Sequence, residues 1–271
     1  MSTTAEAPVD SSSSGGGAPL VELRNVGKSY GNIIALKDIN LRVGAGQVTG
    51  VLGDNGAGKS TLIKIIAGLH KPTEGELLLD GEPVTFDSPK DALNKGIATV
   101  YQDLAVVSLM PVWRNFFLGN ELRKGVLKSL DSNGMRATTI SELKKMGIDL
   151  PDVDAPIGSL SGGQRQCVAI ARAIFFGARV LILDEPTAAL GVKQSGMVLR
   201  YITAAKEQGF GVIFITHNPH HAHMVGDHFV LLNRGRQKLD CTYDEITLEH
   251  LTQEMAGGNE LEALSHELGR R

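Results

Sequence analysis

The stretch QVTGVLGDNGAGKSTLIKIIAGL, residues 47–69, predicts a strand, a glycine-rich turn and a helix in direct succession. Its first part, Gln47–Leu52, is mostly apolar, as is typical of a strand covered on both faces. After the turn, aliphatic residues recur on one helix face, at Leu62, Ile65, Ile66 and Leu69. A strand that enters a helix through such a turn is a building block of α/β sheets.

Short apolar runs alternate with helical patterns on both sides of this unit. Further strands are expected at Leu20–Val26, Ile33–Val43, Glu76–Asp80, Ile97–Tyr101, Val180–Leu183, Val212–Thr216 and Phe229–Asn233. Further helices are expected at Pro111–Glu121, Asn133–Met146, Ser161–Phe176 and Val192–Gln208. The alternation predicts an α/β sheet with helices on both faces. The region from Leu104 to Gly177 has helical patterns and no convincing strand, so we interpret it as a helical subdomain inserted into the sheet.

The two ends of the chain differ from this pattern. Residues 1–19 are rich in Ser, Gly and Ala, which predicts a disordered tail, because too little apolar surface is available to offset the entropy of ordering. The globular domain is expected over residues 20–256. The sequence from Ile246 onward is expected to be mainly helical and includes a C-terminal tail at residues 257–271.

Charge and hydropathy exclude several classes of protein. The chain has 27 basic and 30 acidic residues, a net charge of −3, and no long basic block, so we expect no nucleic-acid partner. It has no apolar run of about 18 residues and no secretory signal, so a membrane role would need a partner.

Cysteine and histidine patterns give no strong metal signal. Cys167 and Cys241 lie far apart and are interpreted as reduced thiols of a cytosolic protein. A cluster of histidines could bind a metal, but we interpret it as the solvated start of a helix; it comprises His220, His221 and His223.

The turn GDNGAGKS, at Gly53–Ser60, matches the phosphate-loop pattern G-x-x-x-x-G-K-[ST]. Its glycines allow backbone N–H groups to turn toward phosphate oxygens, and the helix N-terminus adds partial positive charge. Lys59 is expected to reach the β- and γ-phosphates, and the Ser60 hydroxyl to bind Mg²⁺. The alternative, an accidental glycine-rich turn, is disfavoured by the flanking strand and helix. The expected nucleotide-binding residues are Gly53, Asp54, Asn55, Gly56, Ala57, Gly58, Lys59, Ser60 and Thr61.

Two other predicted strands end in polar residues that could complete this site. Asp184 and Glu185 follow the apolar run Val180–Leu183. Asp184 is placed to hold Mg²⁺ through water, and Glu185 to act as general base toward the attacking water. His217 follows the strand Val212–Thr216 and could contact the γ-phosphate and orient water or Glu185, although alone it would be an ordinary surface histidine.

A second helix start, LSGGQ at residues 160–164, also has the features of an anion site. Ser161 is a good N-cap, and Gln164 completes a capping box. Gly162 and Gly163 leave backbone amides uncovered at the positive end of the helix. One chain thus offers two phosphate-binding devices for one nucleotide.

These motifs resemble the ATPase subunits of ABC transporters. The matching segments occur in the order of that family between about residues 20 and 255, at Gly53–Ser60, Gln102, Leu160–Gln164, Val180–Glu185 and His217. The resemblance implies a P-loop NTPase core, which is a mainly parallel sheet with flanking helices plus an antiparallel β subdomain, and an inserted α-helical signature subdomain. It also implies ATP and Mg²⁺, and a homodimer in which two chains pair head to tail.

In such a dimer each ATP lies between the phosphate loop of one chain and the signature of the other. The resemblance assigns the trans contacts to Ser161, Gly162, Gly163 and Gln164. Gln102 would bind Mg²⁺, sense the attacking water and signal to the membrane subunits. Tyr30 is placed to stack on adenine, with a packing tyrosine as the alternative. Gly191 stands where the family usually has an Asp that helps to connect the two nucleotide sites.

The segments Val100–Ala105 and Asn115–Gly119 resemble the ATPases of monosaccharide importers of the ribose, xylose and fructose types. The expected function is ATP hydrolysis at the cytoplasmic face of the cell membrane that energises sugar uptake. The expected partners are transmembrane permease subunits, which would dock a coupling helix at Gln102–Gly119, and indirectly an extracytoplasmic solute-binding protein.

Three other functions stay open as alternatives at this point. The chain could serve import of another small solute, such as an amino acid. A soluble ABC ATPase acting on ribosomes or DNA is disfavoured, because such proteins usually have two ATPase domains or a long coiled-coil insertion. A nucleotide-dependent regulator with little turnover is disfavoured by the presence of Glu185 and His217.

Overall fold

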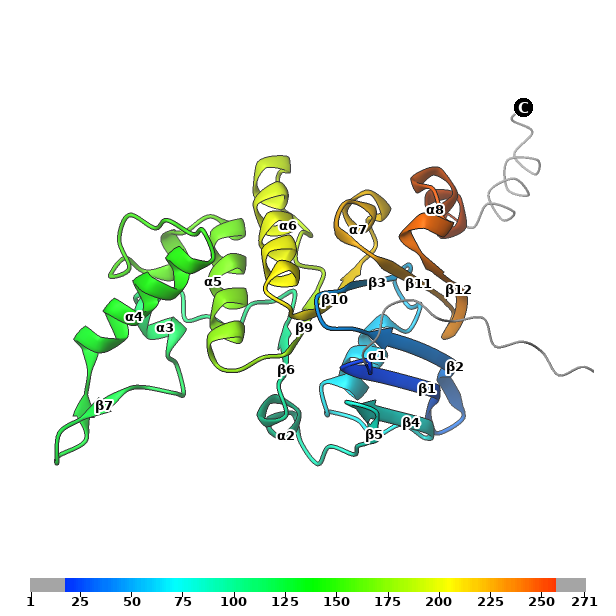
Figure 1. Cartoon of the computed structure of the whole chain (residues 1–271), viewed down its shortest axis with the longest axis horizontal. Coiled ribbons are helices and arrows are strands. Elements are labelled where there is room, and N and C mark those ends of the chain that lie inside the picture. Colours follow the sequence, from blue (N-terminus) through cyan, green and yellow to red (C-terminus); the bar gives the residue numbers. More distant parts are fainter. Residues whose placement is uncertain (1–17, 257–271) are drawn as a thin grey trace, which may run out of the picture.

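The structure, a computed structural model, describes residues 18–256, and a ten-stranded sheet runs through it (Figure 1). The strands of this sheet are β1 (Val21–Tyr30), β2 (Ile33–Val43), β3 (Val48–Leu52), β4 (Glu74–Leu79), β5 (Glu82–Pro83), β6 (Ile97–Val100), β9 (Val180–Asp184), β10 (Gly211–Thr216), β11 (His228–Asn233) and β12 (Arg236–Thr242). The α-helices are α1 (Lys59–Ile66), α2 (Pro89–Asn94), α3 (Val112–Phe116), α4 (Ser132–Lys145), α5 (Gly162–Phe175), α6 (Val192–Glu207), α7 (Pro219–Val225) and α8 (Leu248–Met255).

The catalytic half of the sheet is parallel, in the order β11-β3-β10-β9-β6. Strands β3 and β10 are buried at every residue, which explains why their sequences are apolar runs without alternation. Because these strands are parallel, their carboxyl ends meet at one edge of the sheet. The predicted α/β core is therefore confirmed.

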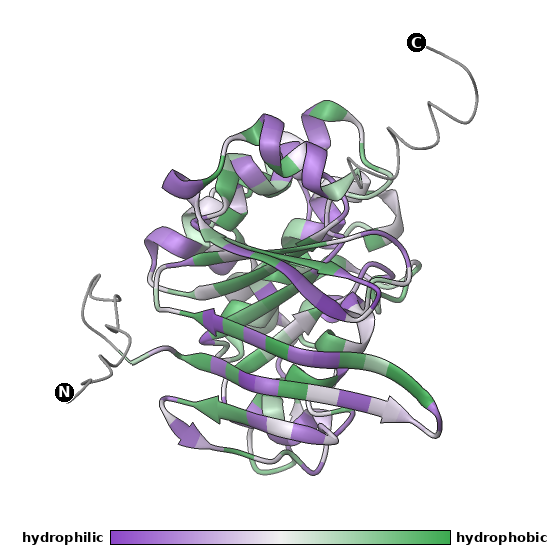
Figure 2. Cartoon of the chain, turned by 90° about the vertical axis from the view of Figure 1, so that its right-hand side faces the viewer, coloured by the Kyte–Doolittle hydropathy of each residue, from purple (hydrophilic) through white to green (hydrophobic). Residues whose placement is uncertain are grey.

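The other half of the sheet is antiparallel and contains β1, β2, β4 and β5. It joins the parallel half where Arg236 of β12 pairs with Lys37 of β2. Figure 2 shows hydrophobic and hydrophilic residues interleaved along these strands. This pattern is typical of a sheet with one solvated face.

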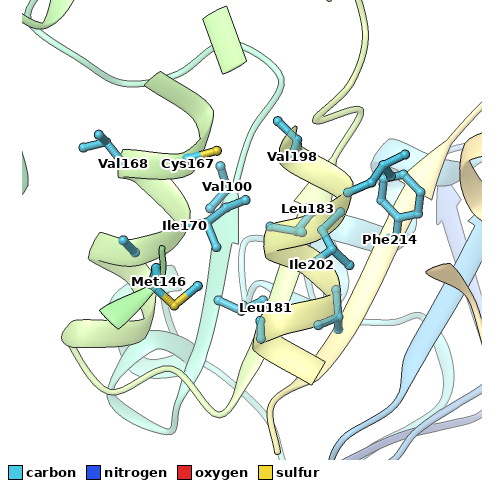
Figure 3. Packing of buried hydrophobic residues seen from close by; sticks show 14 of the residues in the cluster. Val100, Met146, Cys167, Val168, Ile170, Leu181, Leu183, Val198, Ile202 and Phe214 are labelled. Atoms are coloured by element: carbon cyan, nitrogen blue, oxygen red, sulfur yellow. The ribbon is translucent and has the colours of Figure 1, made fainter. Parts of the chain in front are cut away.

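Two apolar clusters hold the fold together. One packs the antiparallel strands and α1 against one face of the parallel strands, and the other packs the opposite face of the parallel strands together with α3 to α8. In Figure 3, Leu181 and Leu183 of β9 lie between Ile170 of α5 and Ile202 of α6. The signature helix α5 is thus anchored directly to the strand that ends in Asp184.

Several sequence predictions differ from the structure, and α2 and β5 were not predicted at all. No strand was expected between residues 104 and 177, yet a hairpin forms there from β7 (Arg123–Lys124) and β8 (Ser129–Leu130). The β12 strand was missed, because exposed and half-buried residues alternate along it without an apolar run. Helix α3 ends at Phe116 rather than near Glu121, since Gly119 adopts a φ of +84° and its N–H donates to the Glu121 carboxylate.

Two predictions concern the ends of the chain. The predicted disordered tail falls almost entirely on residues 1–17, and the predicted helical tail on residues 257–271, both outside the described residues. The helical prediction after Ile246 is confirmed only for α8. Over residues 18–256, no helix combines the length and apolar character that a bilayer span requires.

Candidate functional site

The phosphate loop connects β3 to α1 and is packed tightly from behind. Gly53 has a φ of +147°, and a Cβ there would lie 2.5 Å from the carbonyl oxygen of Leu232. Gly58 has a φ of +110°, and a Cβ there would lie 2.6 Å from Leu36 Cδ2. Both positions therefore require glycine, for backbone conformation and for close approach.

The start of α1 offers hydrogen-bond donors without acceptors. No side chain caps this helix end, and the amides of Gly58, Lys59 and Ser60 donate no hydrogen bond to any residue between 18 and 256. Lys59 is buried, and its Nζ donates to the carbonyl oxygens of Gly53 and, at 3.0 Å, of Asp54. A buried ammonium group and free amides at the positive end of a helix fit the terminal phosphates of a nucleotide.

Neighbouring strand ends bring the predicted catalytic side chains to this loop. β9 and β10 run in parallel register with Ile215 opposite Asp184, so Glu185 and His217 follow adjacent strand ends. Glu185 Oε2 lies 2.9 Å from His217 Nδ1, and Glu185 Oε1 lies 4.0 Å from Lys59 Nζ. Glu185 adopts a left-handed φ of +48°, and its N–H donates to the Ile215 carbonyl at 3.0 Å, which fixes the turn. The structure thus joins Lys59, Glu185 and His217 in one cluster.

Asp184, the predicted cation ligand, lies at the end of β9 and is partly buried. Burial, followed by the adjacent Glu185 carboxylate, raises the pKa of Asp184, while Lys59 acts in the opposite direction. A divalent cation beside this carboxylate would favour its charged form. Ser60, exposed in the first turn of α1, provides a hydroxyl oxygen. Carboxylate and hydroxyl oxygens are hard ligands of the kind that Mg²⁺ prefers, so these residues fit the predicted metal.

The signature residues form the capped start of α5. Ser161 Oγ accepts from the Gln164 N–H at 3.3 Å, and the Ser161 N–H donates to Gln164 Oε1 at 2.9 Å, which confirms the predicted capping box. A Cβ at Gly163 would lie 3.1 Å from Gln194 Cβ. Glycine therefore lets the start of α5 approach the start of α6 closely.

The structure does not bring the signature to the phosphate loop of the same chain. Figure 1 shows α5 and α1 in separate parts of the molecule. No hydrogen bond or ion pair that the structure describes joins residues 161–164 to residues 53–61. The amides of Gly162 and Gly163 also lack an acceptor among residues 18–256. A nucleotide phosphate that binds at the start of α5 would therefore need a phosphate loop other than the one in the same chain.

Two other predicted residues lie on the surface. Gln102, after β6, is exposed and forms no hydrogen bond to another described residue. Tyr30, at the end of β1, is 41% exposed, with its ring 5.6 Å from that of His70 and 5.3 Å from Lys28 Nζ. Both side chains are accessible to a ligand, and their assigned roles stay predictions.

The departure from the family pattern at Gly191 has a structural counterpart. Gly191 occupies the N-cap position of α6 and offers no side-chain acceptor to the helix. A Cβ at this position would meet no atom within 4 Å. The fold would therefore accommodate a larger residue, and glycine here is not required by packing.

Sequence reasoning missed two supports of the site. Gly235, in the turn between β11 and β12, donates its N–H to the Ala57 carbonyl at 2.9 Å and so braces the phosphate loop. His221 Nδ1 lies 2.9 Å from Thr187 Oγ1 and links α7 to the segment after Glu185. Neither contact has a local sequence signal, because each joins segments that are distant along the chain.

The interpretation of the histidine cluster is correct in part. α7 begins at Pro219, with the Asn218 side chain accepting from the His221 N–H, so a helix start is confirmed. His221, however, is half-buried rather than solvated, and this burial, reinforced by His220 and His217, lowers its pKa. His223 stacks on Phe229 with the ring centroids 5.9 Å apart.

This chain is similar in sequence to a known protein family and to several named proteins. The family model described as ABC transporter matches residues 36–188. The xylose/arabinose import ATP-binding protein XylG of Sulfolobus acidocaldarius is 42% identical over 236 residues, covering 87% of this chain and 93% of that protein. The fructose import ATP-binding protein FrcA of Rhizobium meliloti is 39% identical over 248 residues, covering 89% and 95%. The ribose import ATP-binding protein RbsA 2 of Streptomyces avermitilis is 36% identical, and only 48% of its length is matched.

Solved structures of ATP-binding cassettes have a fold similar to that of this chain. The dimeric post-hydrolysis state of the ATP-binding cassette MJ0796, bound to ADP and Pi, aligns with a TM-score of 0.68 at 29% identity, over 82% of this chain and 98% of that one. The cbiO1 protein of Clostridium perfringens, part of the ABC transporter complex cbiONQ, aligns with a TM-score of 0.73 at 28% identity, over 93% and 99%.

Proposed function

Because this chain belongs to the ABC transporter family, we propose that it is the ATP-hydrolysing subunit that energises uptake of a monosaccharide through a membrane permease. The observation that carries the proposal is the cluster in which Glu185 contacts His217 at 2.9 Å and faces Lys59 at 4.0 Å. This cluster lies where the carboxyl ends of parallel strands meet the phosphate loop, which is where open α/β sheets bind ligands.

In this proposal the residues of the site have different roles in ATP hydrolysis. Lys59 and the amides at the start of α1 would bind the β- and γ-phosphates of ATP. Ser60, Asp184 and Gln102 would hold Mg²⁺, which would supply positive charge beside the phosphate oxygens. Glu185 would accept the proton of the attacking water at its carboxylate, and His217 would hold that carboxylate in orientation through its contact with Oε2.

The second anion site supports a dimer as the active form. The Gly162 and Gly163 amides at the start of α5 have no acceptor among residues 18–256, and no described hydrogen bond joins this helix start to the phosphate loop of its own chain. In a head-to-tail pair, Ser161, Gly162, Gly163 and Gln164 of one copy would close over the γ-phosphate held by the other. The MJ0796 cassette, which is dimeric in its structure with ADP and Pi, supports this arrangement by similarity.

A cavity beside Gln102 supports a docked permease. It has a volume of about 290 Å³ and lies between β6 and α5, with Tyr101, Leu104, Val106, Asn115, Asn120 and Phe176 among its lining residues. Most of this lining is apolar, as suits one face of an amphipathic helix. We propose that a permease coupling helix sits here, so that the chain is held at the cytoplasmic face of the membrane.

The sugar assignment rests on the relatives. XylG and FrcA are named for xylose/arabinose and fructose import, and this chain covers nearly the whole length of both. The sugar would be bound by the permease and an extracytoplasmic solute-binding protein, and not by the residues of this site.

Reconstitution tests the proposal directly. The chain and its permease are placed in proteoliposomes that carry ATP and Mg²⁺ on the side of the ATPase. We expect uptake of a labelled pentose or hexose that depends on ATP and on the sugar-loaded binding protein. The Glu185→Gln variant should support none. If ATP is hydrolysed but none of the monosaccharides tested is taken up, the sugar assignment is contradicted.

A further inference from the structure

The hairpin β7–β8 carries a surface that the proposed reaction does not use. It projects from the helical region at the far left of Figure 1. Between its strands, Val126 and Leu127 are 101% and 93% exposed. No other large apolar side chain described by the structure is as exposed as either of these two.

The conformation of the turn explains this exposure. The Lys128 N–H donates to the Gly125 carbonyl at 3.1 Å, so Val126 and Leu127 occupy the two corner positions of a four-residue turn. Corner positions favour Gly, Pro, Asn and Asp, and a branched aliphatic residue gains nothing there from packing. Stability of the folded chain therefore does not account for these two residues.

The hairpin is also held in a defined position. The Asp131 N–H donates to the Leu122 carbonyl at 2.8 Å, and Lys124 Nζ pairs with the Asp131 carboxylate at 2.9 Å. Asp131 caps α4 as well, accepting from the Gly134 N–H at 3.1 Å. These contacts therefore fix the position of the hairpin relative to α4, a helix of 14 residues.

Basic side chains flank the exposed tip. Arg123, Lys124 and Lys128 are exposed, and residues 122–130 contain no acidic residue. Asp131 is paired with Lys124, whereas Lys128 makes no ion pair with any residue from 18 to 256. Aliphatic residues at a tip with basic residues behind them match an anionic lipid surface, where the former enter the acyl boundary and the latter meet headgroups. Protein–protein interfaces, in contrast, are depleted in Lys.

We propose that this hairpin is a second membrane contact, in which Val126 and Leu127 insert among the headgroups of an anionic bilayer. The inference rests on the proposed function in one respect, namely that a permease holds the chain at the membrane. Asn120 lines the cavity assigned to the permease, and six residues of chain from there to Val126 span at most about 20 Å. A permease bound in the cavity would therefore raise the effective concentration of the tip at the lipid surface.

Vesicle sedimentation of the full chain without permease tests the proposal. The probes are vesicles of phosphatidylcholine alone and of equimolar phosphatidylcholine and phosphatidylglycerol. We expect binding to the anionic vesicles that weakens about tenfold in the double variant Val126→Ser, Leu127→Ser. The double variant Arg123→Gln, Lys128→Gln should weaken it by a similar factor, and added salt should lower binding further. Met224→Ser, at a 71% exposed position on α7, is the matched control and should bind like the parent.

Three results would overturn the inference. The parent chain could fail to bind anionic vesicles, or the tip variant could bind as well as the parent. The tip variant could also keep its vesicle binding yet lose the detergent-solubilised permease, which would make the permease the partner of the hairpin. ATP hydrolysis by each variant, expected to be unchanged, is measured separately, so failure of the lipid contact and failure of the ATPase assignment are distinguished.

Discussion

The two helix starts of this chain, at α1 and at α5, solve the same electrostatic problem in different ways. α1 begins after glycines with φ values of +147°, +83° and +110°, and no side chain from residues 18–256 caps it. α5 begins at Ser161 with an ordinary φ of −62° and a complete capping box. The loop before α1 has a strained backbone that can surround a ligand. The start of α5 is already capped by its own side chains, so it can only add contacts to a ligand that is bound elsewhere.

This difference indicates which end holds the nucleotide and which end closes over it. At the α1 end, Lys59 faces Glu185, which contacts His217, whereas residues 161–164 form no ion pair with any other residue of the described range 18–256. We therefore expect changes at the α1 end to abolish chemistry in each chain. Changes at the start of α5 should affect hydrolysis only when two chains meet.

The largest effect is expected from Glu185→Gln. Loss of a general base lowers kcat by a factor of about 10² to 10⁴, while ATP binding is kept because the phosphate contacts are unchanged. Steady-state hydrolysis and equilibrium nucleotide binding should be measured on the same preparation. Parent-like turnover would show that Glu185 is not the base and would remove the main chemical distinction between the two ends.

Gly53→Ala should disrupt the phosphate loop itself. Its Cβ would lie 2.5 Å from the Leu232 carbonyl at a φ of +147°, so we expect a loss of about 3 kcal/mol in the free energy of unfolding together with loss of ATP binding. Gly56→Ala is the control, since its φ is +83° but no atom lies within 4 Å of the added Cβ, and it should cost only about 1 kcal/mol. Denaturant unfolding of both variants would separate packing from backbone strain.

Ser161→Ala should have a modest effect on stability. It removes the acceptor of the Gln164 N–H, and loss of an N-cap costs about 1 kcal/mol, or about 2 °C in Tm for a chain of this size. Nucleotide binding by a single chain should be unaffected, and this is measured under conditions where the protein is monomeric. A large drop in that monomer affinity would mean that α5 contributes to the site in cis.

The smallest effect concerns the two thiols, Cys241 on β12 and Cys167 on α5. Burial raises the pKa of Cys241 on β12 to about 11, and it raises the pKa of Cys167 on α5 further. Because the thiolate is the reactive form, alkylation of Cys241 should be slow at neutral pH and rise about tenfold per pH unit toward 11. Cys167 should stay unlabelled until the chain unfolds. Mass spectrometry of alkylated peptides, with the denatured protein as control, measures both.

Sequence reasoning reached the parallel core and the site motifs because each has a local signal. The run Val180–Leu183 and the turn Gly53–Ser60 are recognisable without knowledge of any partner segment. The cluster of Lys59, Glu185 and His217 could also be expected, since the carboxyl ends of parallel strands share one edge.

What could not be predicted depends on contacts between distant segments. The β12 strand has no apolar run and is defined by its pairing with β11. The bracing of Ala57 by Gly235 and the contact between His221 and Thr187 likewise arise only from the register of the folded sheet. The hairpin at residues 123–130 was missed because its strands have two residues each, too few for a period to be detected.

The central claim is that one chain holds the ATP and a second chain closes over it. Mixing two inactive variants, Lys59→Ala and Gly163→Asp, tests this most directly through the ATPase rate. A random mixture should recover about a quarter of the parental rate, because half of the dimers are mixed and each of these has one intact site. If the mixture stays as inactive as either variant alone, although both variants fold and associate, the nucleotide site does not span two chains.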